Sequence, residues 1–211
     1  LDLMARSQEV LKDHPVNKRR IARGDLPATS IWLFWGSSRR STMPSFQSIY
    51  HRKVAVTSGV SLLQGLGKMS GMTLLEIKGV TDGLDNDYSA QAKNALDSLK
   101  NYDIVIIHIE APDEAGHAGS VKEKVAAIEK IDKYMVKQVR DWRGDEMRVL
   151  ISADHPTPIS VRTHTGDPVP FLLWGSGYRS NGAKRLTESE AKRTGLVINP
   201  GWNIMHRLIG E

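Results

Sequence analysis

The 211-residue sequence contains no cysteine. This absence excludes disulfide bridges, thiolate nucleophiles and zinc sites built from cysteine. The sequence also lacks any apolar run near the ~18–20 residues needed to cross a bilayer, because its most apolar stretch, Ile104–Ile109, has the length of one strand. Since nothing at the start resembles a secretory signal, we expect a cytoplasmic protein with no membrane partner.

Long blocks of one charge are also missing. The net charge is +5, from 29 basic and 24 acidic residues, and the basic residues form no group longer than Lys18–Arg20, with short pairs such as Arg39–Arg40. No nucleic-acid-binding motif accompanies them. We therefore expect no nucleic-acid partner and interpret these charges as solvated surface.

Short β-rich runs alternate with amphipathic helical runs along the chain. This pattern predicts an α/β fold with a mainly parallel sheet and helices on both faces. The runs near residues 104 and 148 are apolar at nearly every position, which indicates central strands covered on both faces. The predicted strands are Ile31–Trp35, Val54–Thr57, Thr73–Ile77, Ile104–Ile109, Arg148–Ala153 and Val169–Trp174.

Apolar periodicity predicts helices over Asp2–Lys12, Tyr88–Lys100, Ser120–Trp142 and Trp202–Leu208. In the third of these, Ser120 and Glu123 form a capping box. Two long loops are predicted, and long loops in compact domains are often functional. They are Gly36–Tyr50 and Asp154–Pro168.

A first polar cluster directly follows the predicted strand Ile104–Ile109. Pro112 followed by Asp113 and Glu114 is typical of a helix N-terminus. Asp113 and His117 are four residues apart, so they share one face if a helical turn forms. A carboxylate oxygen and an imidazole nitrogen can then bind one cation.

A second polar cluster follows the predicted strand near residue 148. Asp154 and His155 are adjacent, and a sharp turn stiffened by the neighbouring prolines would bring both to one site. His164 follows nine residues after His155. Because ligands of open α/β sheets bind at the carboxyl ends of strands, we expect the two clusters to meet there.

Together the clusters offer two aspartates and three histidines. Such ligands suit Mn²⁺ or Zn²⁺ better than Ca²⁺ or Cu⁺, and five of them fit two divalent cations better than one open zinc site. Each residue alone is better explained as a helix cap or a hydrogen-bonded core residue. Their joint position after the two most apolar strands favours metal-dependent phosphoryl or ester chemistry.

Other polar residues have two interpretations each. Glu110, at the mouth of a strand, either binds substrate or caps a turn. Arg162 either clamps a phosphate bidentately or belongs to the surface. Arg20 is a further candidate for substrate contact, and His108 is a hydrogen-bonded core histidine or a partner of a metal-binding residue.

Three motifs resemble the cofactor-independent phosphoglycerate mutases of archaeal type, which belong to the alkaline phosphatase superfamily. The bacterial members of this branch, some labelled homoserine kinases, are most similar. The similarity extends over nearly the whole chain and includes His14–Asn17, Pro27–Trp32 and Gly79–Tyr88. The three motifs are Pro112–His117, Ala153–Pro158, and Thr163–Thr165 before Asp167–Pro170.

The resemblance implies a partial alkaline-phosphatase-like core that holds two divalent metal ions, Mn²⁺ or Zn²⁺. By motif, one cation is bound by Asp113, His117 and His164. The other is bound by Asp154 and His155, with an aspartate and a serine from an N-terminal segment. That serine is the family's nucleophile and forms a phosphoserine while phosphate moves between the 3- and 2-hydroxyls of glycerate. The implied partner is a small phosphorylated substrate, and a homo-oligomer is left open.

The sequence departs from the family pattern because it lacks the Asp-Gly start, the nucleophile motif and the inserted cap domain. We therefore expect residues 1–211 to be the C-terminal portion of a metallophosphatase-like α/β domain, with the nucleophile and cap outside this chain. For the full-length protein we expect a 2,3-bisphosphoglycerate-independent phosphoglycerate mutase of glycolysis and gluconeogenesis. The alternatives are a metal-dependent phosphatase or phosphotransferase on another small phosphoester, such as homoserine phosphate, and an inactive fragment or scaffold.

Overall fold

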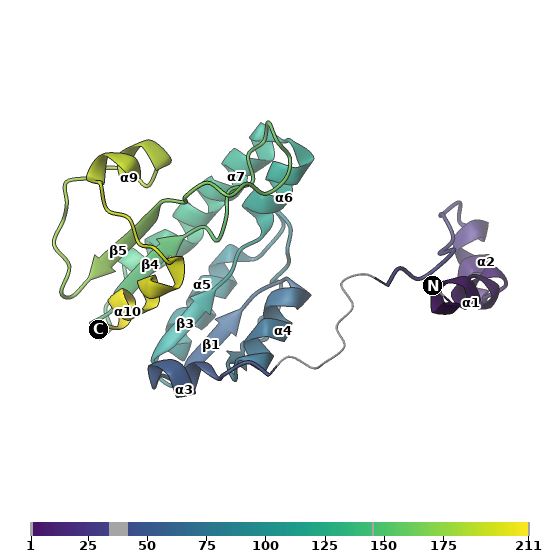
Figure 1. The fold of residues 1–211 in the computed structure, drawn as a ribbon, viewed down its shortest axis with the longest axis horizontal. Helices are drawn as coiled ribbons and strands as arrows, with labels where there is room; N and C mark the ends of the chain where they lie inside the picture. Colours follow the sequence, from purple (N-terminus) through teal and green to yellow (C-terminus); the bar gives the residue numbers. More distant parts are fainter. Residues whose placement is uncertain (1, 34–41, 145, 211) are drawn as a thin grey trace. The chain divides into compact units, whose positions relative to one another are not determined.

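The structure, a computed structural model, describes residues 2–33, 42–144 and 146–210. The chain divides into two compact units, Leu1–Thr42 and Met43–Glu211 (Figure 1). Within the described ranges, no helix combines the length and the apolar character that a membrane crossing requires.

The first unit contains two helices, α1 (Asp2–Lys12) and α2 (Pro15–Ala22). The bounds of α1 confirm the predicted helix. His14 caps α2, because its Nδ1 accepts the N–H of Val16 at 3.2 Å. Pro15 lies in the first turn of α2, where its missing N–H leaves no helical hydrogen bond unmade.

The side chain of Asn17 holds the first unit together. Its Nδ2 donates to the carbonyls of Leu11 and Ala28, both at 2.7 Å, and its Oδ1 accepts the N–H of Ala28 at 2.9 Å. Asn17 is 3% exposed, and it is the one buried residue among those described in this unit. A single amide therefore joins the end of α1 to the chain that follows α2.

The strand predicted at Ile31–Trp35 is wrong over Ile31–Leu33, which forms no strand, and residues 34 and 35 lie outside the described ranges. The N–H of Ile31 donates instead to the hydroxyl of Ser7 at 3.0 Å. All three residues of Ile31–Leu33 are exposed, so this apolar run belongs to no sheet.

Three parallel strands form the central sheet of the second unit, in the order β2 (Thr73–Leu74), β1 (Val54–Thr57) and β3 (Ile104–Ile107). All residues of β1 are buried, whereas all residues of β3 are half-buried. The prediction that the strand near residue 104 is central is therefore wrong. In the described chain β1 is central because it has a strand on each side, while β3 has one neighbour.

Helices flank this sheet. α4 (Ser61–Met69) connects β1 to β2, and α5 (Tyr88–Ser98) connects β2 to β3. Because β2 and β3 lie on opposite sides of β1 and such connections are right-handed, α4 and α5 lie on opposite faces. This confirms the predicted α/β arrangement, with α5 ending two residues before the predicted Lys100.

The apolar core lies between α5 and the helices that follow β3. Three of its buried members are alanines, which let the elements that carry them approach closely. Ile107, Ile109 and Ile131 pack against this core. The buried members are Tyr88, Ala92, Ala111, Ala127 and Met135.

The chain after β3 forms α6 (Ala111–Ala118) and then a long helical segment. The side chain of Ser120 accepts the N–H of Glu123 at 3.3 Å, which is one half of the predicted capping box. The other half is not formed, because the N–H of Ser120 donates to the Ala115 carbonyl at 2.9 Å. The long predicted helix is confirmed, with one irregularity in its middle. It consists of α7 (Val121–Ile131), a π-helical turn (Asp132–Val136) and α8 (Lys137–Arg140).

Two further strands, β4 (Arg148–Ser152) and β5 (Phe171–Gly175), pair antiparallel in a second sheet. The connection between them, residues 153–170, contains no helix, and a parallel crossover normally needs one. The parallel arrangement therefore holds for β1, β2 and β3 alone. Like β3, β4 is half-buried at most, so the predicted cover on both of its faces is also wrong.

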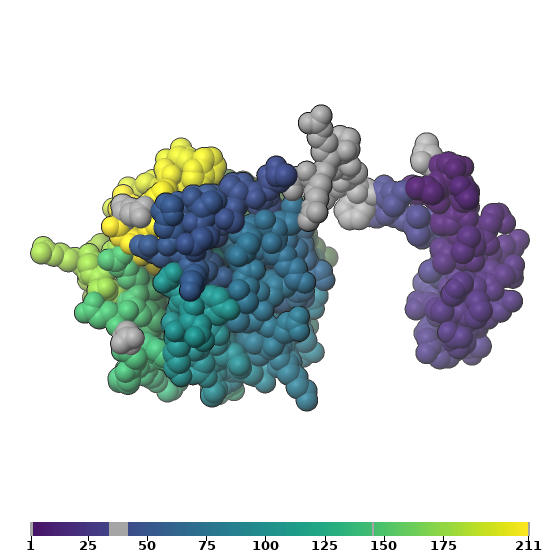
Figure 2. Space-filling view, turned by 90° about the horizontal axis from the view of Figure 1, so that it is seen from below, coloured from purple at the N-terminus to yellow at the C-terminus, as the bar shows by residue number. Residues whose placement is uncertain are grey.

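The remaining elements are short. α3 (Phe46–Tyr50) lies within the predicted loop Gly36–Tyr50, of which residues 36–41 are outside the described ranges. The predicted C-terminal helix is confirmed as a 3-10 turn (Gly201–Asn203) followed by α10 (Ile204–Ile209), after α9 (Glu188–Thr194). The rings of Tyr50 in α3 and His206 in α10 meet edge to face at 5.5 Å, and Figure 2 shows these segments side by side.

Candidate metal centre

The residues predicted to bind metal lie where β3 and β4 end. α6 begins three residues after β3 with Pro112 in its first turn, and Gly119 ends it with a φ of +70°. Asp113 and His117 therefore lie one turn apart on α6, with Asp113 Oδ2 3.2 Å from His117 Nε2. β4 is followed by the turn that carries Asp154 and His155.

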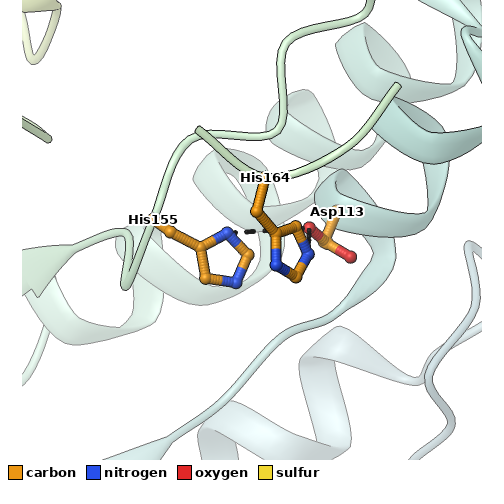
Figure 3. A group of neighbouring side chains, drawn as sticks. All are labelled: Asp113, His155 and His164. Atoms are coloured by element: carbon orange, nitrogen blue, oxygen red, sulfur yellow. Dashed lines mark ion pairs between the residues drawn. The ribbon is translucent and has the colours of Figure 1, made fainter. Parts of the chain in front are cut away.

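Asp113 lies beside the ring of His164, which stands between Asp113 and His155 in Figure 3. Its Oδ1 lies 3.4 Å from His164 Nε2 and 4.0 Å from His155 Nδ1. His117 Nε2 and His164 Nε2 are 3.1 Å apart, and the rings of His155 and His164 lie 3.7 Å apart between centroids. One carboxylate on α6 thus meets three imidazoles, two of which come from the loop after β4.

Asp154 lies at the rim of this cluster. Its Oδ2 is 3.4 Å from His155 Nε2, and its side chain is 71% exposed. The structure therefore brings all five predicted metal-binding residues together, with Asp113 inside and Asp154 open to solvent. Their metal-binding role stays a prediction.

Backbone and hydroxyl groups orient these side chains. His117 Nδ1 lies 3.0 Å from the carbonyl oxygen of Arg162. A carbonyl only accepts, so Nδ1 carries a proton, and Nε2 is the nitrogen that faces Asp113 and His164. The hydroxyl of Thr157 donates to Asp113 Oδ1.

Lys124 supports this arrangement from α7, because its Nζ donates to the Thr157 carbonyl at 2.6 Å. Sequence reasoning did not single out Thr157 or Lys124. Thr157 had a signal, since it is the hydroxyl between the two prolines of the Asp154–Pro158 turn. Lys124 had none, because it lies on the surface pattern of a helix.

The spacing of the donor atoms fits a divalent cation. At bond lengths of about 2.0–2.1 Å, two donors of a tetrahedral zinc site lie roughly 3.3 Å apart. His117 Nε2 lies 3.1 Å from His164 Nε2 and 3.2 Å from Asp113 Oδ2, whereas His164 Nε2 lies 3.4 Å from the other oxygen, Asp113 Oδ1. Donor atoms of Asp113, His155 and His164, one from each, also lie within 4.8 Å of one another. Oxygen and imidazole donors without thiolate also suit Mn²⁺ and Zn²⁺.

Two groups beside the cluster titrate away from their ordinary values. Burial raises the pKa of Glu110 above 4.5, and the negative charges of Asp113 and Glu114 raise it further. Burial lowers the pKa of His108 below 6.5, although Asp154 and Asp113 oppose this. The site is therefore rich in negative charge, which a bound cation would offset.

The three residues predicted to contact substrate lie in different segments of the chain and make different contacts. Glu110 faces the cluster, and its carboxylate lies within 4.8 Å of oxygens of Asp113 and Glu114. Arg162 has a left-handed φ of +58° and contributes its carbonyl to His117. Arg20 belongs to the first unit, where its Nε donates to the Leu26 carbonyl at 2.8 Å.

A cavity of about 400 Å³ lies beside β1, α4 and residues 74–80. Ser58, Lys68 and Lys78 line it, and none of the five candidate metal-binding residues does. The cavity is therefore separate from the candidate metal-binding cluster, which opens directly to solvent at the strand ends.

An α/β fold with aspartate and histidine donors at its strand ends is typical of metal-dependent enzymes. The chain belongs to the Metalloenzyme superfamily, whose profile matches residues 1–206. Membership of this family implies the use of divalent metal ions, and it confirms the family resemblance found in the motifs.

Curated relatives are named as phosphoglycerate mutases. The 2,3-bisphosphoglycerate-independent phosphoglycerate mutase of Methanothrix thermoacetophila is 41% identical and aligns with 99% of this chain and 54% of its own length. The enzyme named 2,3-bisphosphoglycerate-independent phosphoglycerate mutase 2 of Methanothermobacter thermautotrophicus is 41% identical over 92% of this chain and 48% of its own length. The chain thus spans about half the length of the curated relatives it matches.

Solved structures show the same fold. A protein from Pyrococcus horikoshii superimposes with a TM-score of 0.83 at 31% identity, over 98% of this chain and 55% of its own. The cofactor-independent phosphoglycerate mutase of Thermoplasma acidophilum gives a TM-score of 0.61 at 23% identity, over 98% of this chain and 49% of its own. The second likeness supports the fold alone.

Proposed function

We propose that the protein is a 2,3-bisphosphoglycerate-independent phosphoglycerate mutase, and that this chain contributes the half of the active site that binds two divalent cations. The observation that carries the proposal is the convergence of Asp113 with His117, His155 and His164, whose nitrogens lie 3.2 to 4.0 Å from one or the other oxygen of Asp113. The curated relatives of this family bear the name of that enzyme. The phosphoserine nucleophile would lie outside the matched motifs.

Within this proposal, Asp113, His117 and His164 hold one cation, and Asp154 and His155 contribute to the other. Bound cations of this kind, Mn²⁺ or Zn²⁺, neutralise the charge of a phosphomonoester and lower the pKa of an attacking hydroxyl. The protein's own groups prepare the site. The Arg162 carbonyl fixes the tautomer of His117, and the Thr157 hydroxyl fixes the rotamer of Asp113.

Calorimetric titration of the metal-free full chain with Mn²⁺ and Zn²⁺ tests the metal centre. We expect His117→Ala and His164→Ala to weaken binding by more than the roughly 10–100-fold lost when a group that merely orients a ligand is removed. His51→Asn is the matched control, because His51 is exposed on the surface and its left-handed φ of +51° suits asparagine. Unchanged binding in both alanine variants would remove the metal centre from the proposal.

The reaction is tested in the complete gene product by following 3-phosphoglycerate and 2-phosphoglycerate with phosphorus NMR. We expect interconversion that depends on added metal and is lost in Asp113→Asn. Release of inorganic phosphate, or turnover of homoserine phosphate instead, would identify the phosphatase or phosphotransferase alternative. Metal binding without turnover of any phosphoester would favour the scaffold.

A further inference from the structure

A line of polar side chains connects the ends of β1 and β3 beside the metal-binding cluster. Ser58 follows β1, and its Oγ lies 2.9 Å from Nδ1 of His108, which follows β3. On the other side of the ring, His108 Nε2 lies 3.3 Å from Glu110 Oε2. The line therefore runs from the sheet to a carboxylate at the mouth of the site.

The carboxylate of Glu110 gives the protons along this line a direction, because it only accepts and therefore favours a proton on His108 Nε2. The backbone N–H of Val60 donates to Ser58 Oγ at 3.0 Å and leaves the Ser58 hydroxyl proton available for His108 Nδ1. A neutral imidazole whose Nδ1 accepts a proton carries its own proton on Nε2. The ring of His108 thus presents its Nε2–H to Glu110, and an N–H group is a strong hydrogen-bond donor to a carboxylate.

The position of His108 is fixed by its surroundings. The backbone N–H of His108 donates to the Thr57 carbonyl at 2.9 Å, and the backbone carbonyl of His108 accepts a hydrogen bond from Gln91 Nε2 at 3.2 Å. Gln91 is fully buried and accepts Asn86 Nδ2 at 2.9 Å. The side chains of His108 and Glu110 are both half-buried, at 18% and 23% exposed, so the carboxylate is supported by the ring and still reaches solvent.

The charge around Glu110 restricts what it can bind. Oxygens of Glu110, Asp113 and Glu114 lie within 4.8 Å of one another, which repels the phosphate and carboxylate groups of a substrate. A hydroxyl group carries no charge and donates a proton, so it can form a hydrogen bond with Glu110. This identifies the part of a substrate that the residue can recognise.

We propose that Glu110 accepts a hydrogen bond from a substrate hydroxyl next to the phosphoester, and that Ser58 and His108 are positioning residues that hold this carboxylate in place. The inference rests on the proposed function and adds to it a contact that selects hydroxylated phosphoesters. Ser58 and His108 act through Glu110 and do not touch the substrate.

Ligand binding to the full chain loaded with Mn²⁺ tests the hydroxyl contact. The probes are 3-phosphoglycerate and 3-phosphooxypropanoate, which differ by the hydroxyl alone, with inorganic phosphate as a third ligand. We expect the wild type to prefer the hydroxylated probe by about tenfold or more, the usual value of a hydrogen bond to a charged group. Glu110→Ala should abolish the preference, whereas the matched control Glu114→Ala should retain it.

Two measurements test the positioning role. His108→Phe should lose most of the preference, and His108→Gln, which restores a donor, should regain part of it. Nitrogen-15 NMR of histidine-labelled wild type should show the proton of His108 on Nε2, a result that does not depend on any variant folding.

The outcomes separate the two proposals. A proton on Nδ1 of His108, or a preference that survives Glu110→Ala, overturns this inference. Equal binding of both phosphoesters to the wild type removes the hydroxyl contact and leaves the proposed function standing. Binding of none of the three ligands contradicts the proposed function and the inference with it.

Discussion

Asp113 makes polar contacts with four side chains of the candidate site. It meets His117, His155 and His164, and it accepts the hydroxyl of Thr157. The backbone of α6 sets the position of Asp113, and the hydrogen bond from the Thr157 hydroxyl orients its carboxylate. A small hydroxyl therefore controls the geometry that three imidazoles share.

The substitution Thr157→Val replaces the hydroxyl with a methyl group and keeps the shape of the side chain. We expect metal affinity to fall by about 10–100-fold, because Asp113 loses the donor that orients it while every metal-binding side chain remains. Calorimetry with Zn²⁺ measures the change. The half-buried Thr194→Val serves as the control, because the Thr194 hydroxyl donates to the Ala191 carbonyl within α9. Affinity equal to the wild type would show that Asp113 needs no such support.

The lowered pKa of His108 links stability to pH. The unfolded chain takes up a proton near pH 6.5, whereas burial keeps the folded histidine neutral to lower pH. The neutral ring therefore favours the folded state above pH 6.5, and this contribution is lost as the pH falls from there through the folded pKa.

We expect the free energy of unfolding of the metal-free wild type to decrease more steeply below pH 6.5 than that of His108→Gln, which has no titrating group at this position. Urea unfolding at several pH values measures both slopes. Parallel slopes would mean that His108 titrates alike in the folded and unfolded chain.

At the scale of elements, the close contact between α6 and the loop after β4 places the two halves of the cluster. Gly116 of α6 permits it, because a Cβ there would lie 2.5 Å from the Thr157 carbonyl oxygen and 2.9 Å from Thr157 Cγ2. Gly65, inside α4, has open space in the same direction. Gly116 thus allows a close contact with the loop, whereas an alanine side chain at Gly65 would meet no neighbouring atom.

Alanine at these two glycines should act in opposite directions. Gly116→Ala should destabilise the fold by about 1–3 kcal/mol through overpacking, and it should weaken metal binding because the loop moves away from Asp113. Gly65→Ala should stabilise the fold by about 0.5–1 kcal/mol, since it lowers the entropy of the unfolded chain without strain. Urea unfolding followed by circular dichroism measures both, and destabilisation by Gly65→Ala would contradict the explanation.

Elements with a local signal could be predicted from the sequence. The α1 helix, β1 and the long helix after Ser120 depend on periodicity and capping, which neighbouring residues supply. The antiparallel pairing of β5 and the half-burial of β3 could not be predicted, because they depend on which strands meet in space. An apolar run shows that a strand avoids water and does not show what covers it.

Some residues of the candidate site could likewise be predicted from a local pattern in the sequence, and others could not. Asp113 and His117 could be paired from their helical spacing, and the turn at Asp154 and His155 from its prolines. The Arg162 carbonyl and Lys124 are joined to the cluster by contacts between residues about 30 to 50 positions apart, and no local pattern encodes them.

At the scale of the molecule, a bound cation would join distant parts of the second unit. His117 on α6 and His164 in the loop are 47 positions apart, and both contact Asp113. Because the folded arrangement gathers these donors and the unfolded chain does not, metal binding should stabilise the fold.

Removal of metal by a chelator should therefore lower the melting temperature. At free Zn²⁺ about 100 times the dissociation constant, the stabilisation is about 2.7 kcal/mol, which corresponds to roughly 5–10 °C for a domain of this size. Thermal unfolding with and without chelator measures it, and His117→Ala should show little of the shift. Equal melting temperatures in the wild type would contradict binding to the folded state.

The amide of Asn17 has a consequence for how the first unit tolerates sequence change. Aspartate at this position has no N–H to give, leucine has neither donor nor acceptor, and glutamine is one methylene too long for the same three bonds. Every other amino acid at this position would leave at least one of these backbone groups without its partner, so the unit tolerates substitution of Asn17 poorly.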